Sequence, residues 1–78
     1  MMKTVRLNVK FIRKRMLECH IRYEKDLAQM LDMSLTKLSD ALLGKTSLLR
    51  PKRLAKLTEI LECDIGDILE VVEVKDDE

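Results

Sequence analysis

The chain has 78 residues, 37% of them charged, and contains two glycines, one proline, one tyrosine and one phenylalanine. This length provides one domain with a small core, and the shortage of glycine, proline and aromatic residues favours an all-α protein over a sheet. The net charge is +1, no apolar run approaches a membrane span and no signal-peptide pattern opens the chain, so we expect a cytoplasmic protein with no membrane partner.

A short strand and a helix are predicted at the start of the chain. The segment KTVRLNV alternates apolar and polar residues, which is typical of a strand. Asn8 can cap a following helix. After it, apolar residues recur at steps of three and four, which is typical of a helix. This apolar stripe consists of Val9, Ile12, Met16 and Cys19. We expect the helix to end within the segment HIRY, residues 20–23.

Two further helices with a tight turn between them are predicted for the segment DLAQMLDMSLTKLSDALLG. Its apolar residues form two separate sets at helical spacing, which one continuous helix does not fit. Between the sets, Asp32 tolerates a left-handed backbone and Ser34 can cap the next helix. We expect a second helix from residue 23 or 24 to residue 31. A third helix should span residues 34–43, with Gly44 as its left-handed end.

The rest of the chain is predicted to form two more helices and a final strand. Pro51 suits the first turn of a fourth helix. Asp64 can cap a short fifth helix that carries Asp67 in its first turn. After Leu69, the segment VVEV is typical of a strand, and KDDE should be solvated.

The two terminal strands carry opposite charges, which favours their pairing. The residues concerned are Lys3 and Arg6 on the first strand and Glu70 and Glu73 on the second. A two-stranded ribbon is only marginally stable in water, whereas a second subunit could extend or cover it. We therefore expect a homodimer.

The small net charge conceals an uneven distribution along the chain. Residues 1–61 hold 14 Lys and Arg against 6 Asp and Glu, a net charge of +8. Residues 62–78 hold one lysine against eight acids, a net charge of −7, and end in an acidic tail over about 70–78. A basic body suits a polyanionic partner such as nucleic acid, with charges that merely solvate helix faces as the alternative.

The segment 24–43 meets the steric demands of a helix-turn-helix unit, within one domain that spans residues 1–78. Ala28 supplies the small residue where the two helices cross, and Leu27, Leu31, Met33, Leu38 and Ala41 supply apolar anchors. One face of the third helix is left exposed, and in this motif that face enters the DNA major groove. Its candidate base-reading residues are Leu35, Thr36, Lys37, Ser39 and Asp40.

These motifs resemble the small Cro and lambda-repressor-like helix-turn-helix regulators of bacteria and their phages. The resemblance covers nearly the whole chain and includes DLAQMLDMSLTKLSDALLGK and LAKLTEILECDIGDILE. In the second segment, the matching positions are Leu54, Leu57, Leu61, Cys63, Gly66, Asp67, Leu69 and Glu70. The resemblance implies an all-α, five-helix fold, here with short terminal β-strands, operator binding as a dimer, and no cofactor.

The sequence departs from the usual pattern of that family at three kinds of position. Asp32 stands where the turn usually has glycine, and Glu24 stands where a phosphate-contacting glutamine is common. Leu35 and Asp40 replace residues that are often polar or cationic. Lys37 is therefore the one cation of the predicted reading face.

The candidate DNA contacts differ in their chemistry. Lys37 can reach guanine O6 and N7, and Asp40 can accept a hydrogen bond from cytosine N4. Thr36 and Leu35 can touch a thymine methyl group, with contact to a protein partner as the alternative for Leu35. The candidate phosphate-binding residues flank the motif and are Lys25, Ser34, Lys45, Thr46, Ser47, Arg50, Lys52 and Arg53.

Enzymatic and metal chemistry find little support in the sequence. The chain has one histidine, no glycine-rich phosphate loop and no nucleophile with a recognisable base. Cys19 and Cys63 lie in apolar surroundings, which indicates reduced core residues, and a metal site that joins them to His20 lacks a recognisable ligand spacing. We expect no catalysis, no metal and no small-molecule substrate.

The sequence thus predicts a DNA-binding transcriptional regulator that recognises double-stranded DNA with residues 34–43 and represses by occluding a promoter. The alternative is a protein-interaction or antitoxin-like accessory module on the same fold, with weak or no DNA binding. The small number of cations on the reading helix favours this alternative, and Leu35 would then contact the partner.

Overall fold

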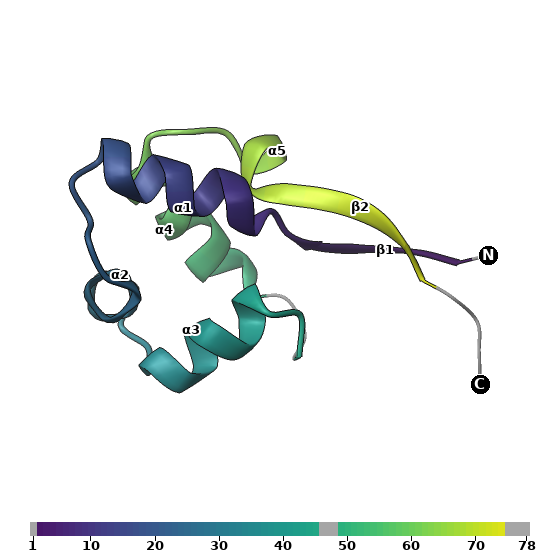
Figure 1. Cartoon of the computed structure of the whole chain (residues 1–78), viewed down its shortest axis with the longest axis horizontal. Helices are drawn as coiled ribbons and strands as arrows, with labels where there is room; N and C mark the ends of the chain where they lie inside the picture. The colour runs from purple at the N-terminus through teal and green to yellow at the C-terminus, as the bar shows by residue number, and fades with distance from the viewer. Residues whose placement is uncertain (1, 46–48, 75–78) are drawn as a thin grey trace.

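The computed structural model describes residues 2–45 and 49–74 of the chain (Figure 1). Five helices gather into one body, and two strands form a ribbon that projects from it. The elements are β1 (Met2–Leu7), α1 (Val9–Glu18), α2 (Glu24–Met30), α3 (Leu35–Leu42), α4 (Pro51–Leu61), α5 (Ile65–Ile68) and β2 (Leu69–Val74). The predictions of a mostly helical domain with five helices and two terminal strands are confirmed.

Side chains cap the starts of three helices, as the sequence predicts. The Asn8 side chain accepts a hydrogen bond from the backbone N–H of Phe11, 3.2 Å away. Ser34 accepts one in the same way from the N–H of Lys37. At α5, Asp64 and Asp67 form a reciprocal capping box. Each such cap stabilises its helix by about 1 kcal/mol, because it satisfies a backbone donor that has no partner within the helix.

The helices α1 to α4 all end in the same way, at a residue with a left-handed backbone. These residues are His20 (φ 63°), Asp32 (φ 58°), Gly44 (φ 76°) and Glu62 (φ 54°). After each one, the next backbone N–H reaches back to a carbonyl five residues earlier, as Met33 does to Ala28 over 3.0 Å. This hydrogen bond closes the helix and turns the chain sharply. Only one of the four residues is the glycine that suits such a backbone best.

The end of α1 differs from the sequence prediction. The helix stops at Glu18, before residues 20–23, where the sequence predicts its end. His20 takes the left-handed conformation, and the N–H of Ile21 donates to the carbonyl of Met16 over 2.7 Å. The early stop allows the side chain of Ile21, only 7% exposed, to join the core.

The core lies among the helices and includes the base of the ribbon. Its buried residues are Leu7, Ile12, Met16, Ile21, Leu27, Ala28, Leu31, Leu38, Ala41, Leu42, Leu57, Leu61 and Ile68. The apolar residues that the sequence assigns to the first helix and to the helix-turn-helix unit supply more than half of this set. Cys19 and Cys63 are half-buried free thiols that pack against it.

The ribbon confirms that the terminal strands pair. β1 and β2 are antiparallel, with Lys3 opposite Glu73 and Arg6 opposite Glu70. Arg6 Nε donates to a Glu70 carboxylate oxygen over 2.7 Å. Residues 70–74, which the sequence groups with the acidic tail, therefore belong to β2. Leu7 is buried and anchors the ribbon to the helical body.

Candidate nucleic-acid interface

The helices α2 and α3 and the turn between them form the helix-turn-helix unit that the sequence predicts. Asp32 adopts the left-handed conformation in the turn, and Ser34 caps α3. Ala28 is only 2% exposed, which agrees with its predicted position at the crossing of the two helices. The observed ends of α2 and α3 lie within one residue of the predicted ends.

Arg53 of α4 ties the turn to the rest of the body. Its Nε donates to the carbonyl of Leu31 over 3.1 Å, and its Nη2 donates to the carbonyl of Asp32 over 2.8 Å. These two carbonyls follow α2 and have no partner within that helix. The sequence assigns Arg53 to phosphate binding, whereas its guanidinium holds the backbone from which α3 departs.

One face of α3 is open to solvent over its first turn. Leu35, Thr36 and Lys37 are exposed, and the Leu35 residue retains 45% of its accessible surface. Ser39 and Asp40 are half-buried, so the five predicted base-reading residues do not share one environment. The opposite face of α3 is buried through Leu38, Ala41 and Leu42.

Glu24, the first residue of α2, joins three helices. One of its carboxylate oxygens accepts a hydrogen bond from Arg13 Nη2 of α1, and the other accepts one from Ser39 Oγ of α3, both over 3.2 Å. Sequence reasoning identifies Glu24 only as a departure from a family pattern. It misses both partners because they lie 11 and 15 residues away on other elements.

The predicted phosphate-binding residues fall into three groups. Lys25, Lys45, Arg50 and Lys52 are exposed cations. The ammonium of Lys25 lies 5.7 Å from the ring centroid of Tyr23, which holds it near the start of α2. Ser34 serves as a helix cap and Arg53 as a support for the turn. Thr46 and Ser47 lie outside the described residues.

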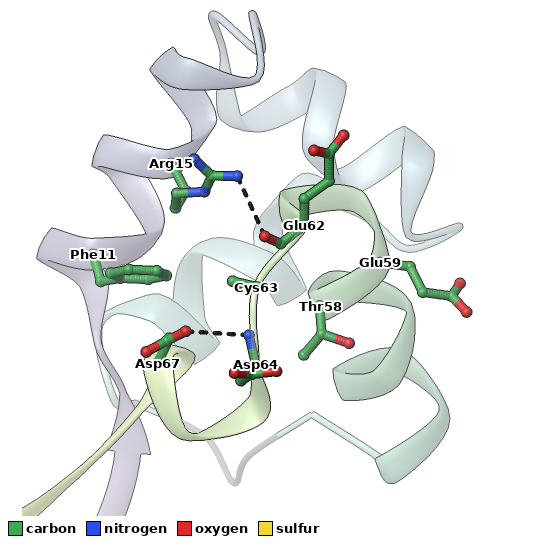
Figure 2. A pocket seen from close by; sticks show the side chains of 8 residues that line it. All are labelled: Phe11, Arg15, Thr58, Glu59, Glu62, Cys63, Asp64 and Asp67. Carbon is green, nitrogen blue, oxygen red and sulfur yellow. Dashed lines mark hydrogen bonds between the residues drawn. The ribbon is translucent and has the colours of Figure 1, made fainter.

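A shallow hollow of about 660 Å³ lies on another side of the molecule, between α1, α4 and α5 (Figure 2). Its lining residues are Phe11, Arg15, Thr58, Glu59, Glu62, Cys63, Asp64 and Asp67. Burial is the main reason that the pKa of the Cys63 thiol is raised, and the carboxylate of Asp67 adds to this shift. Figure 1 shows α5 and α3 at opposite sides of the body. The acidic hollow is therefore remote from α3.

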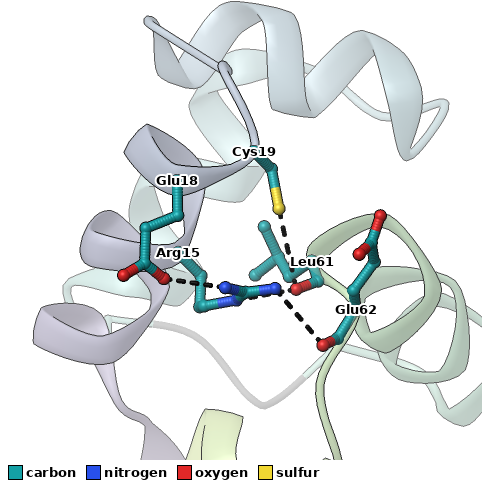
Figure 3. Close-up of polar contacts among 5 residues, drawn as sticks. All are labelled: Arg15, Glu18, Cys19, Leu61 and Glu62. Atoms are coloured by element: carbon teal, nitrogen blue, oxygen red, sulfur yellow. Dashed lines mark hydrogen bonds and ion pairs between the residues drawn. The ribbon is translucent and has the colours of Figure 1, made fainter.

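Arg15 serves the fold at this acidic side (Figure 3). Its guanidinium donates to the backbone carbonyls of Leu61 and Glu62, over 2.9 and 3.3 Å, and to the carboxylate of Glu18 over 2.7 Å. The hydrogen bond to Glu18 is the main reason that the pKa of Arg15 is raised. The thiol of Cys19 also points to the carbonyl of Leu61. Arg15 thus caps the end of α4.

The described part of the chain contains neither a helix suited to a membrane nor a cluster suited to a metal ion. None of its helices has both the length and the apolar character needed to cross a bilayer. Residues 2–45 and 49–74 also contain no group of three or more His, Cys, Asp or Glu side chains arranged to hold a metal ion.

Comparison with known proteins identifies the family. A family model described as the Cro/C1-type HTH DNA-binding domain matches residues 11–73. This range starts within α1 and continues into β2, so it includes the whole unit of α2, turn and α3. No curated protein and no solved structure matches the chain significantly. The chain therefore belongs to the Cro/C1-type helix-turn-helix DNA-binding domain family.

Proposed function

We propose that the protein is a sequence-specific transcriptional regulator with a lambda-repressor-like arrangement, which inserts α3 into the major groove of double-stranded DNA. The observation that carries this proposal is the exposed first turn of a helix whose orientation is fixed from both sides. Arg53 supports the turn before α3, and Glu24 accepts a hydrogen bond from Ser39 within it. A rigid, exposed helix is what base recognition requires.

Lys37 is the residue best suited to read a base. It is exposed near the start of α3, and an ammonium group at that position can contact O6 and N7 of guanine. Thr36 and Leu35 offer methyl groups to a thymine. Asp40 can accept a hydrogen bond from cytosine N4. Ser39 acts through Glu24, because its hydroxyl already donates to that carboxylate.

The exposed cations around the motif supply affinity that does not depend on sequence. Lys25, Lys45, Arg50 and Lys52 would neutralise phosphates along the DNA backbone. Each neutralised phosphate steepens the salt dependence of binding by about 0.9 log units per log unit of salt. Thr46 and Ser47 are also proposed as neutral donors to phosphates.

The regulator would act in the cytoplasm as a homodimer on a pseudo-palindromic site, with two α3 helices in successive major grooves about 34 Å apart. Two exposed valines of the ribbon, Val5 and Val71, support the dimer, because a second subunit would remove them from water. Bound at a promoter, such a dimer represses by occlusion.

A selection from random duplexes tests this function, followed by comparison of two lysine variants. Lys37→Gln should weaken binding to the selected site about tenfold or more, because it removes a base contact. Lys56→Gln is the matched control, since it removes an exposed lysine of α4 that lies outside the helix-turn-helix unit. Selection that yields no consensus sequence contradicts the proposal, as does an equal effect of both variants.

A protein-interaction module remains the second candidate, because apolar side chains lie exposed on the same unit. Met30 and Leu35 retain 45% of their accessible surface and Leu43 retains 65%. If the protein is such a module, Leu35→Asp should abolish binding of the protein partner, while Lys37→Gln should leave that binding unchanged. If the protein instead binds DNA, Lys37→Gln should reduce the affinity for DNA more than Leu35→Asp does.

A further inference from the structure

We propose that Arg13 of α1 is a phosphate-binding residue of the DNA interface, and that Glu24 is the positioning residue that holds its guanidinium beside α3. This inference rests on the proposed DNA-binding function and adds to it a contact from outside the helix-turn-helix unit. Neither residue belongs to the set of DNA contacts that the sequence predicts.

The position of Arg13 follows from the two hydrogen bonds of Glu24. Arg13 Nη2 donates to one carboxylate oxygen over 3.2 Å, and Ser39 Oγ donates to the other over 3.2 Å. Since Ser39 belongs to α3, the guanidinium of Arg13 is separated from the reading helix by a single carboxylate. A cation of α1 is thereby brought to the edge of the surface that faces DNA.

The remaining donors of Arg13 are available to a phosphate. A guanidinium has five N–H donors, and within the described residues Glu24 is its polar partner through one of them. The Arg13 side chain stays 61% exposed, whereas that of Glu24 is 26% exposed. The pair therefore presents its positive member to solvent, with the fork geometry that suits phosphate oxygens.

The charges around the start of α2 support the same assignment. Glu24 alone would repel the DNA backbone, and Arg13 neutralises it. Lys25, a predicted phosphate contact, is the next residue along α2 and is also exposed. Exposed ion pairs contribute little to folding, so stability alone does not account for this arrangement, and variants of Arg13 should fold.

A salt series with a random-sequence duplex of about 30 bp tests the contact, because phosphate binding does not require a specific site. Arg13→Gln should lower the affinity at low salt about tenfold. It should also reduce the steepness of the salt dependence by about 0.9 per subunit. Lys14→Gln is the matched control, since Lys14 is an exposed cation of the same helix. Lys14→Gln should change the affinity and the salt dependence less than half as much as Arg13→Gln does.

A double-variant cycle tests the role of Glu24. Glu24→Gln keeps an oxygen that can accept from Ser39 but removes the ionic pairing with Arg13. If Glu24 positions Arg13, then Arg13→Gln should cost less than about threefold in affinity when Glu24→Gln is already present. If Glu24 only neutralises Arg13, then Glu24→Gln frees that cation to bind DNA more strongly. Arg13→Gln would then lower the affinity more in the Glu24→Gln background than in the parent protein.

The outcomes separate this inference from the function on which it rests. A parent protein that binds no duplex contradicts the proposed function itself. A parent that binds, with Arg13→Gln and Lys14→Gln equivalent, contradicts only the phosphate contact of Arg13. A larger cost of Arg13→Gln in the Glu24→Gln background overturns the positioning role of Glu24. Thermal unfolding of each variant, expected to match that of the parent, confirms that these differences arise in binding.

Discussion

The guanidinium of Arg53 lies against the carbonyl oxygen of Asp32, at an Nη2–O distance of 2.8 Å, and this contact fixes the turn of the helix-turn-helix unit from outside it. Asp32 itself has a left-handed backbone. The orientation of α3 therefore depends on a residue of α4, which lies 21 positions further along the chain.

Replacing Arg53 should affect both stability and DNA binding. Arg53→Ala removes two hydrogen bonds, one to the partly buried carbonyl of Leu31 and one to the exposed carbonyl of Asp32, so the free energy of unfolding should fall by about 1–2 kcal/mol. Lys52→Ala removes the same charge from an exposed position and should change stability by less than about 0.5 kcal/mol. Urea denaturation measures both values. Equal losses for the two variants would show that the turn does not need Arg53.

Because α1, α2 and α4 end at non-glycine residues with a left-handed backbone, glycine at these positions should increase stability. Glu62→Gly should raise the free energy of unfolding by about 0.5–1 kcal/mol, because glycine adopts φ 54° without a steric penalty. Asp32→Gly should raise the free energy of unfolding by less, since aspartate tolerates this conformation better than glutamate does. Gly44→Ala, the reverse change at φ 76°, should cost about 1 kcal/mol. Chemical denaturation in which Glu62→Gly is destabilising would contradict this interpretation of the helix ends.

Two variants of Ser34 can distinguish its contribution to helix capping from its effect on DNA binding. Ser34→Ala should lower the free energy of unfolding by about 1 kcal/mol, because the N–H of Lys37 loses its acceptor. Ser34→Asp retains a cap and should preserve stability, but it adds a negative charge at the start of α3 and should weaken DNA binding. Denaturation and duplex binding are measured on both variants. Unchanged DNA affinity of Ser34→Asp would indicate that this end of α3 does not approach phosphates.

The raised pKa of Cys63 predicts a loss of stability in alkaline solution. Burial raises this pKa above its ordinary value of 9.0, so the unfolded chain releases the thiol proton at a lower pH than the folded chain does. The unfolded state then binds fewer protons, and the stability that Cys63 contributes is lost as pH rises from about 8 towards 10. The difference in unfolding free energy between the parent and Cys63→Ala should narrow over this range. A constant difference would contradict the raised pKa.

The local features of the fold could be predicted from sequence. Asn8, Ser34 and Asp64 act within three residues of their own positions, so capping can be recognised from a short segment. The pairing of the strands follows from the alternation of apolar residues and from opposite charges such as those of Arg6 and Glu70. In each case the interacting side chains carry a signal in the sequence itself.

The contacts that fix the candidate interface could not be predicted in the same way. Arg53 and Arg15 bind backbone carbonyls, which every residue possesses, so no partner can be identified from the sequence. The bridge from Arg13 through Glu24 to Ser39 joins three helices, and it depends on how they pack. The early end of α1 also escapes prediction, because it depends on a histidine that accepts a left-handed backbone.

The most direct measurement is a salt series of binding to the DNA upstream of the protein's own gene, with a scrambled duplex of equal length as competitor. A DNA-reading α3 predicts binding that weakens steeply with salt, survives the competitor and is lost in Lys37→Gln. A folded protein that binds neither duplex at low salt, or binds both equally, would contradict sequence-specific recognition by α3.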